Sequence, residues 1–144
     1  MNILLTSVGR RSYMVNYFKE ALADQGEIHA ANSVETYSLG LADKYVITPL
    51  IYDNNYIDFL LDYCIKHKIT SVIPLFDIDL PILARNKKIF SDLNIQLIVS
   101  DFQIIEICND KWLTYNYLTS NGFKSPLTFL SINDALKAIN RTEI

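Results

Sequence analysis

The sequence predicts an α/β fold, a three-layer Rossmann-like parallel sheet of about five strands with helices on both faces. Short apolar runs of strand length alternate with amphipathic stretches of helix length, the pattern of repeated strand–helix units. Half of the 144 residues are hydrophobic and 20% are charged, which is enough apolar material for a buried core. For a sheet built in this way we expect the common strand order 3-2-1-4-5.

The expected strands lie in the first two thirds of the chain, at 3–5, 28–31, 45–47, 71–75 and 95–99. Pro74 lacks an N–H for the ladder, so we expect it near the end of its strand. The fifth run is almost wholly apolar, which is typical of a strand covered on both faces.

Helices are expected between these strands. After residue 11, apolar residues recur at i, i+3, i+4 and i+7 on one helical face, namely Met14, Tyr17, Phe18 and Ala21. Gly26 ends this helix. A second face consists of Ile57, Leu60, Leu61 and Cys64. Residues 80–90 form the next helix, with Pro81 tolerated in its first turn.

Beyond Ser100 the alternation changes, and a C-terminal helix–strand–helix extension is expected. Helices are predicted near 102–108 and over 111–120, the latter stopped by Asn121-Gly122. An extended segment at 126–129 precedes a helix that starts near Ser131, where Ser131 and Asp134 resemble a capping box. We therefore expect an α/β domain at 1–108 and the truncated start of a further domain at 109–144.

Composition excludes several classes of protein. The 13 basic and 16 acidic residues leave a net charge of −3, which argues against nucleic acid and anionic membranes as partners. No apolar run approaches the ~18 residues of a membrane span. Cys64 and Cys108 are interpreted as reduced core residues, and with only His29 and His67 besides, a zinc site is not expected. These features predict a cytoplasmic protein.

Candidate site residues lie in the loops after strands 1 and 4. In an open parallel sheet, ligands bind beyond the carboxyl ends of the strands where the strand order reverses. The candidates are Gly9, Arg10, Arg11, Asp77 and Asp79. Cations at a helix start oppose the macrodipole, so the arginines indicate a phosphate or carboxylate ligand, or else ion pairs with the aspartates. The aspartates could instead cap the following helix, hold a metal or orient an amine.

Other nucleotide motifs are missing. The first loop is not GxGxxG, because positions 7 and 12 are serines, and no Walker A loop is present. Asn32 stands where a dinucleotide fold places an acid, which argues against a nicotinamide enzyme. Lys111 follows Asn109-Asp110 at a helix start, where it is either a solvated lysine or the neighbour of an anion.

Four segments together resemble one family. They are ILLTSVGRR at 3–11, GLADK at 40–44, IPLFDIDL at 73–80, and NDK at 109–111 followed by Leu118, Gly122, Pro126 and Thr128. In this order they resemble the N-terminal domain of ATP-grasp proteins related to the carbamoyl phosphate synthetase large subunit. The resemblance covers essentially the whole chain, and the two arginines match a motif common among these relatives.

The resemblance implies a ligase that activates a carboxylate as an acyl phosphate with ATP and Mg²⁺ and transfers it to an amine. This domain would form one wall of the substrate cleft and could help form a homodimer. Lys111 is similar to the cation that contacts ATP phosphates in biotin carboxylase and D-alanine–D-alanine ligase. No catalytic residue and no metal ligand are assigned within the chain.

Two departures from the family pattern bear on function. Relatives usually carry an acid at position 32 and a glutamate at position 79, where this sequence has Asn32 and Asp79. The glycine-rich loop, the second ATP lysine and the magnesium carboxylates of the family are also missing, so the chain alone is expected to be inactive and to bind no cofactor tightly. The alternative is a stand-alone Rossmann-like module that binds a small phosphorylated or nucleotide ligand.

Overall fold

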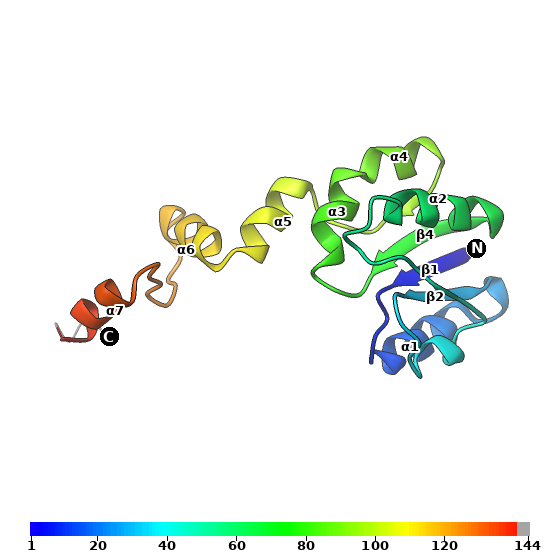
Figure 1. The fold of residues 1–144 in the computed structure, drawn as a ribbon, viewed down its shortest axis with the longest axis horizontal. Helices are drawn as coiled ribbons and strands as arrows, with labels where there is room; N and C mark the ends of the chain where they lie inside the picture. Colours follow the sequence, from blue (N-terminus) through cyan, green and yellow to red (C-terminus); the bar gives the residue numbers. More distant parts are fainter. Residues whose placement is uncertain (141–144) are drawn as a thin grey trace. The chain divides into compact units, whose positions relative to one another are not determined.

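A computed structural model describes residues 1–140 of the chain. Residues 1–100 contain one parallel sheet in the order β3-β2-β1-β4-β5 (Figure 1), which confirms the predicted fold class and strand order. The strands are β1 (Asn2–Thr6), β2 (Ile28–Asn32), β3 (Lys44–Ile47), β4 (Ile69–Pro74) and β5 (Gln96–Leu97). Pro74 is the last residue of β4, where its missing N–H is tolerated.

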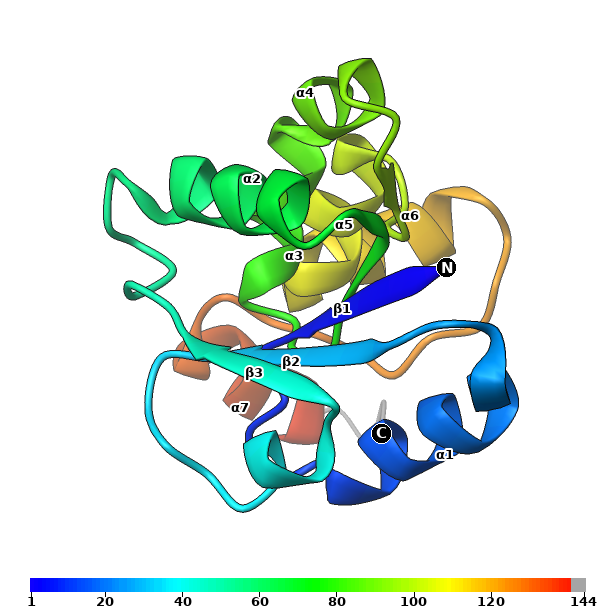
Figure 2. The same ribbon diagram turned by 90° about the vertical axis from the view of Figure 1, so that its right-hand side faces the viewer.

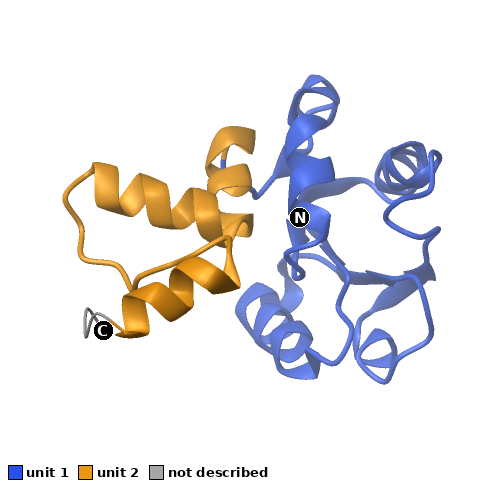
Figure 3. Cartoon of the chain, turned by 60° about the vertical axis from the view of Figure 1, so that its left-hand side comes forward, with its two compact units in different colours: residues 1–100 blue, residues 101–144 orange. Residues whose placement is uncertain are grey.

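The chain divides into two compact units, which are described separately (Figure 3). Unit 1 is Met1–Ser100, and unit 2 begins at Asp101. The expected domains, 1–108 and 109–144, remain a prediction, because a division by contacts does not test where a functional domain begins. Among the described residues, no helix is both long and apolar enough to cross a membrane.

Helices cover both faces of the sheet in unit 1 (Figure 2). On one face lies α1 (Ser12–Leu22); on the other lie α2 (Tyr56–Lys66), α3 (Asp79–Arg85) and α4 (Lys87–Asp92). A short 3₁₀ turn, η1 (Ala23–Gln25), precedes β2, and another, η2 (Leu39–Leu41), follows it. Alternation along the central strand β1 sends Leu4 into the α2–α4 core and Leu5 into the α1 core. Both leucines are fully buried.

The predicted core face of α1 is wrong, because the helix is rotated about its axis relative to the prediction. Val15 and Leu22 are buried and Phe18 packs against the same cluster, whereas Tyr17 is 62% exposed. These three core residues are spaced i, i+3 and i+7, so they form the stripe that meets the sheet. Tyr17 lies beside this stripe, where a tyrosine can keep its polar end in water. By contrast, the predicted face of α2 is confirmed by buried Leu60 and Cys64.

The helix expected at 80–90 is divided into α3 and α4 at Asn86. The Asn86 side-chain Nδ2 donates a 2.8 Å hydrogen bond to the carbonyl of Ile82. Side-chain bonds of this kind compete with the helical ladder, which accounts for the break. The fifth strand is shorter than expected, and Ile98 beyond it is 45% exposed. Full coverage of this edge strand on both faces is therefore a wrong prediction.

Unit 2 contains α5 (Phe102–Asn109), α6 (Lys111–Ser120) and α7 (Ile132–Asn140), as the sequence predicts. Gly122 has a φ of +77° just after α6, the left-handed geometry that ends many helices. The expected strand at 126–129 does not form, because no described segment of unit 2 pairs with it. Cys108 is exposed, so only Cys64 of the two free cysteines is a core residue. Part of the expected domain at 109–144, residues 141–144, lies outside the described residues.

Buried His29 organises a polar cluster at the amino ends of the strands. Its Nδ1 lies 2.9 Å from the Tyr63 hydroxyl and its Nε2 lies 3.2 Å from a carboxylate oxygen of Glu27. Glu27 also pairs with Lys44 at 2.7 Å, and the ring of His67 lies 5.3 Å from that of His29. Burial lowers the pKa of His29, and the hydrogen bond and charge of Glu27 raise it by a smaller amount.

This lowered pKa predicts a loss of stability in mild acid. The unfolded chain takes up a proton near pH 6.5, whereas folded His29 resists protonation, so the free energy of unfolding should fall as the pH drops below 6.5. His29→Gln should flatten this dependence, measured by urea denaturation across the range. His67→Gln serves as the control. An equally steep dependence in His29→Gln would exclude His29 as its source.

Candidate functional site

Strands β1 and β4 lie side by side at the centre of the sheet, as the site prediction requires. Thr6 pairs with Pro74 in the parallel register, and the Leu75 N–H donates to the Thr6 carbonyl at 3.1 Å. Because parallel strands end at the same edge, the loops at 7–11 and 75–78 leave the sheet together. The two loops that carry the candidate residues therefore meet at the point where the strand order reverses.

The loop after β1 is tightly turned. Ser7 and Gly9 both have left-handed backbone conformations, with φ values of +51° and +49°. For a serine this geometry costs about 1–2 kcal/mol, so surrounding contacts must hold it. The Arg11 N–H donates to the Val8 carbonyl at 2.8 Å and closes the turn before α1.

Asn32 connects the turn after β1 to the end of β2. Its Oδ1 accepts a 3.2 Å hydrogen bond from the Gly9 N–H, and its Nδ2 donates to the Val34 carbonyl at 2.9 Å. An aspartate at this position would keep the acceptor but lose the donor. The asparagine that departs from the family pattern is thus part of the scaffold of the loop.

Asp79 is the first residue of α3, and its carboxyl group points into the protein. Its Oδ2 accepts hydrogen bonds from the Thr6 hydroxyl at 2.9 Å and the Tyr56 hydroxyl at 3.5 Å. The residue is 0% exposed, and its Oδ1 has no hydrogen-bond partner among the described residues. Burial raises the pKa of Asp79, while the hydroxyls of Ser7, Thr6 and Tyr56 and the charge of Arg11 act in the opposite direction.

This geometry differs from helix capping, one of the alternatives left open for the two aspartates. Ile78 occupies the cap position of α3 and makes no side-chain cap hydrogen bond. Asp79 instead connects α3 to β1 and α2. Asp77 is exposed and lies in the loop before α3. Among residues 1–140, no three His, Cys, Asp or Glu side chains group as a metal ion would need.

Arg11 is half-buried and lies over an aromatic ring. Its guanidinium carbon is 5.5 Å from the centroid of Phe76, in the loop after β4. Its Nη1 also faces Gly9, where an added Cβ would lie 3.6 Å away. The stacking orients the planar group at the mouth of the two loops.

Neither arginine of the first loop forms a side-chain hydrogen bond or salt bridge with another residue of the described range, 1–140. Arg10 is exposed. No side chain caps the start of α1 either. The Arg11 guanidinium and the start of α1 therefore offer N–H donors at the same loop, which is the chemistry of an anion site.

Lys111 belongs to unit 2, separate from these residues of unit 1. It is the exposed first residue of α6. The Asp110 carboxylate caps this helix by accepting from the N–H groups of Trp112 at 2.8 Å and Leu113 at 2.9 Å. This neighbouring carboxylate already offsets a cation in the first turn, so the position of Lys111 does not by itself require a ligand.

Sequence reasoning missed Thr6, Tyr56 and Phe76. Thr6 ends β1 and Phe76 lies in the loop after β4, but neither carries a charge, so they were not singled out. Tyr56 could have been found, because it is spaced i, i+4 with Leu60 on the predicted core face of α2. A tyrosine at the first residue of a helix can reach across the edge of the sheet with its hydroxyl.

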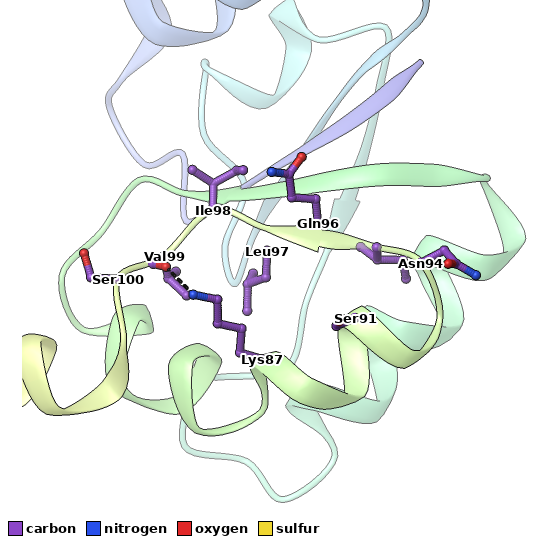
Figure 4. Close-up of a pocket in the computed structure, with 9 residues that line it drawn as sticks. Lys87, Ser91, Asn94, Gln96, Leu97, Ile98, Val99 and Ser100 are labelled. Carbon is purple, nitrogen blue, oxygen red and sulfur yellow. Dashed lines mark hydrogen bonds between the residues drawn. The ribbon is translucent and has the colours of Figure 1, made fainter.

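A separate groove of about 750 Å³ runs between α4 and the edge strand β5 (Figure 4). Its lining includes Lys87 and Ser91 of α4 and the segment from Asn94 to Ser100. The Lys87 Nζ donates to the Val99 carbonyl at 3.0 Å, as the dashed line in Figure 4 shows. Lys87, the charged side chain of this groove, is thereby tied to the protein itself.

The family is established by comparison with known proteins. Residues 3–98 match the model of the PylC-like, N-terminal domain family, and the chain belongs to this family. No curated protein matches the sequence.

Solved structures extend the comparison of the fold. An L-amino acid ligase from Bacillus licheniformis is similar, with a TM-score of 0.64, 23% identity, and coverage of 90% of this chain and 35% of that one. N5-carboxyaminoimidazole synthetase from Staphylococcus aureus gives a TM-score of 0.65 and 15% identity, over 96% of this chain and 35% of that one. The biotin carboxylase subunit of a pyruvate carboxylase gives a TM-score of 0.64 and 18% identity, over 98% of this chain and 32% of that one.

This chain thus spans about a third of the length of each of these proteins. Together with the family match, their folds support an N-terminal domain of an ATP-grasp enzyme. The more specific relationship to carbamoyl phosphate synthetase remains a prediction.

The Asn32 bridge can be tested by two substitutions. Asn32→Ala removes both hydrogen bonds and should lower the free energy of unfolding by about 1–2 kcal/mol. Asn32→Asp keeps the acceptor for Gly9 and should cost less. Urea denaturation measures both. Asn32→Ala with wild-type stability would show that the bridge does not hold the loop.

Proposed function

We propose that this chain is the N-terminal substrate-cleft domain of an ATP-dependent carboxylate–amine ligase that acts through an acyl phosphate. The observation that carries the proposal is the half-buried Arg11, which is stacked on Phe76 where the strand order reverses and whose guanidinium forms no hydrogen bond or salt bridge within residues 1–140. Gly9 allows the loop to turn beneath its guanidinium.

The ligand of this loop is a carboxylate or phosphate group of the substrate. A guanidinium matches two oxygens of such a group at once, and the start of α1 adds N–H donors and the positive end of a helix dipole. Exposed Arg10 adds a second positive charge, and Asp77 lies where it can face an amine. In this proposal Asp79 contributes from beneath the loop.

The nucleotide is held by the ATP-grasp part of the full-length protein. Lys111 alone offers no contact for a base or ribose, so its role is limited to the phosphates of ATP, whose Mg²⁺ lies outside this chain. The exposed apolar face of α7, with Ile132 at 80% and Leu136 at 51%, supports packing of unit 2 against further protein. The boundary at 108/109, a homodimer and a cytoplasmic location belong to the same proposal.

Amino acids are the first substrates to test. One structure with a similar fold is an L-amino acid ligase, and an amino acid carries both groups that such a reaction joins. ADP formation by the protein that contains the ATP-grasp part, with proteinogenic amino acids singly and in pairs, tests the assignment. The assignment would be contradicted if neither amino acids nor a wider set of carboxylic acids stimulated ADP formation.

The 144-residue chain by itself should form no ADP from ATP and Mg²⁺ above the rate without protein. The reason is that a single phosphate-contacting lysine cannot stabilise phosphoryl transfer, which depends on positioned cations around the γ-phosphate. A coupled assay for ADP measures this. Robust turnover by the chain alone would contradict its assignment as a substrate-cleft domain.

Arg11→Gln should raise the KM for the carboxylate substrate about tenfold or more, the worth of hydrogen bonds to a charged group, with little change in the KM for ATP. Initial rates with the protein that contains the ATP-grasp part separate the two constants. Lys88→Gln, which removes an exposed cation of α4, is the control. A selective rise in the KM for ATP would place Arg11 on the nucleotide instead.

A further inference from the structure

We propose that Asp79 is a positioning residue, which fastens Thr6 and Tyr56 to the start of α3 and so holds the loop of residues 7–11 in its anion-binding shape. This inference rests on the proposed anion site and changes the role of one candidate within it. Asp79 then acts on the ligand through Arg11 and the loop rather than by touching the ligand.

Burial is the first reason. Asp79 and Thr6 are 0% exposed and Tyr56 is 1% exposed, so the three side chains form a closed network beneath the loops. A solute that reaches Arg11, which is half-buried, does not reach the Asp79 carboxyl group without a rearrangement of the core. Contact between Asp79 and a ligand is therefore excluded in this conformation.

The second reason is where the network connects. Thr6 is the last residue of β1, Tyr56 is the first residue of α2, and Asp79 is the first residue of α3. One carboxyl oxygen accepts from both hydroxyls, at 2.9 Å and 3.5 Å. The network thus ties three elements together at the edge of the sheet where the loops emerge.

The third reason is the strained residue next to it. Ser7 has a φ of +51° and directly follows Thr6, whose carbonyl is also held by the Leu75 N–H. Thr6 is fixed by its backbone to the loop after β4 and by its side chain to Asp79. A residue held in the left-handed region persists only when its surroundings over-determine it, and these contacts supply that constraint.

A buried carboxyl group is a costly way to fill a core. An apolar side chain of similar volume would avoid the desolvation that raises the pKa of Asp79. The polar network is therefore best explained by its hydrogen bonds, which fix the orientation of Thr6 and Tyr56 relative to the start of α3. The positive charge of Arg11 acts to lower the pKa of the same carboxyl group, so the network and the arginine interact electrostatically.

The test measures the affinity for sulfate, an anion that does not titrate near neutral pH, by isothermal titration calorimetry on the 144-residue chain. Thr6→Val and Tyr56→Phe each remove one hydroxyl that bonds to Asp79 and should weaken sulfate binding about fivefold, the equivalent of one net hydrogen bond. Tyr63→Phe is the matched control, because it also removes a hydroxyl that bonds within the core, to His29. It should leave affinity within about twofold.

Substitutions of Asp79 complete the test. Asp79→Asn keeps the shape and an acceptor oxygen and should bind sulfate within about twofold of wild type, whereas Asp79→Ala should lose most of the affinity. Circular dichroism and urea denaturation establish that each variant is folded. If another variant fails to fold, Tyr56→Phe decides the result, because it keeps the ring and its packing.

Each result has a distinct meaning. Wild-type affinity in folded Thr6→Val, Tyr56→Phe and Asp79→Ala would overturn the positioning role but leave the anion site in place. An equal loss in Asp79→Asn and Asp79→Ala would show that the charge of Asp79 matters rather than its hydrogen bonds, which also contradicts the role. No sulfate binding by wild type would overturn the anion site and this inference with it.

Discussion

The parallel pairing of β1 with β4 is the constraint on which the rest of the site depends. It places the ends of two strands that are some seventy residues apart in sequence at one edge, Thr6 against Pro74. Two side-chain contacts of the site cross this junction. Arg11 from one side lies over Phe76 from the other, and Thr6 donates to Asp79. If the strand order were different, none of these side chains would meet.

The two ends of the sheet use buried polar groups differently. At the amino ends, His29 lies among Tyr63, Glu27 and His67, and both of its ring nitrogens have partners. At the carboxyl ends, one oxygen of Asp79 is bonded and the other has no partner in the described residues. A satisfied network is typical of structure, whereas an incompletely satisfied one beside an open loop is where function is most often found.

The sequence allowed the sheet to be predicted because strand–helix alternation depends on short-range hydrophobic patterns. It misjudged α1 because apolar spacing alone does not distinguish Tyr17 from Val15 as the residue that meets the sheet. The break at Asn86 was missed because it depends on one side-chain hydrogen bond to Ile82. Cys108 was placed in a core because a single apolar helix face gives no sign of whether another element covers it.

The candidate site was predictable in part for a similar reason. The charged residues of the two loops could be named, since strand order brings the loops together. The hydroxyl contacts of Thr6 and Tyr56 with Asp79 could not be predicted. Spacing could have placed Tyr56 on the core face of α2, but only the structure shows where its hydroxyl points. The position of Asp79 after the fourth strand made it a candidate for substrate contact, whereas its complete burial supports an indirect role.

The most direct test of the account is a two-dimensional ¹H–¹⁵N spectrum of the 144-residue chain titrated with sulfate. The account predicts that the largest amide shifts fall at Gly9 to Tyr13, in the loop after β1 and the first turn of α1, with smaller shifts near Phe76. Largest shifts along the groove between Lys87 and Ser100, or around Lys44, would contradict the claim that the point of strand reversal forms the ligand site.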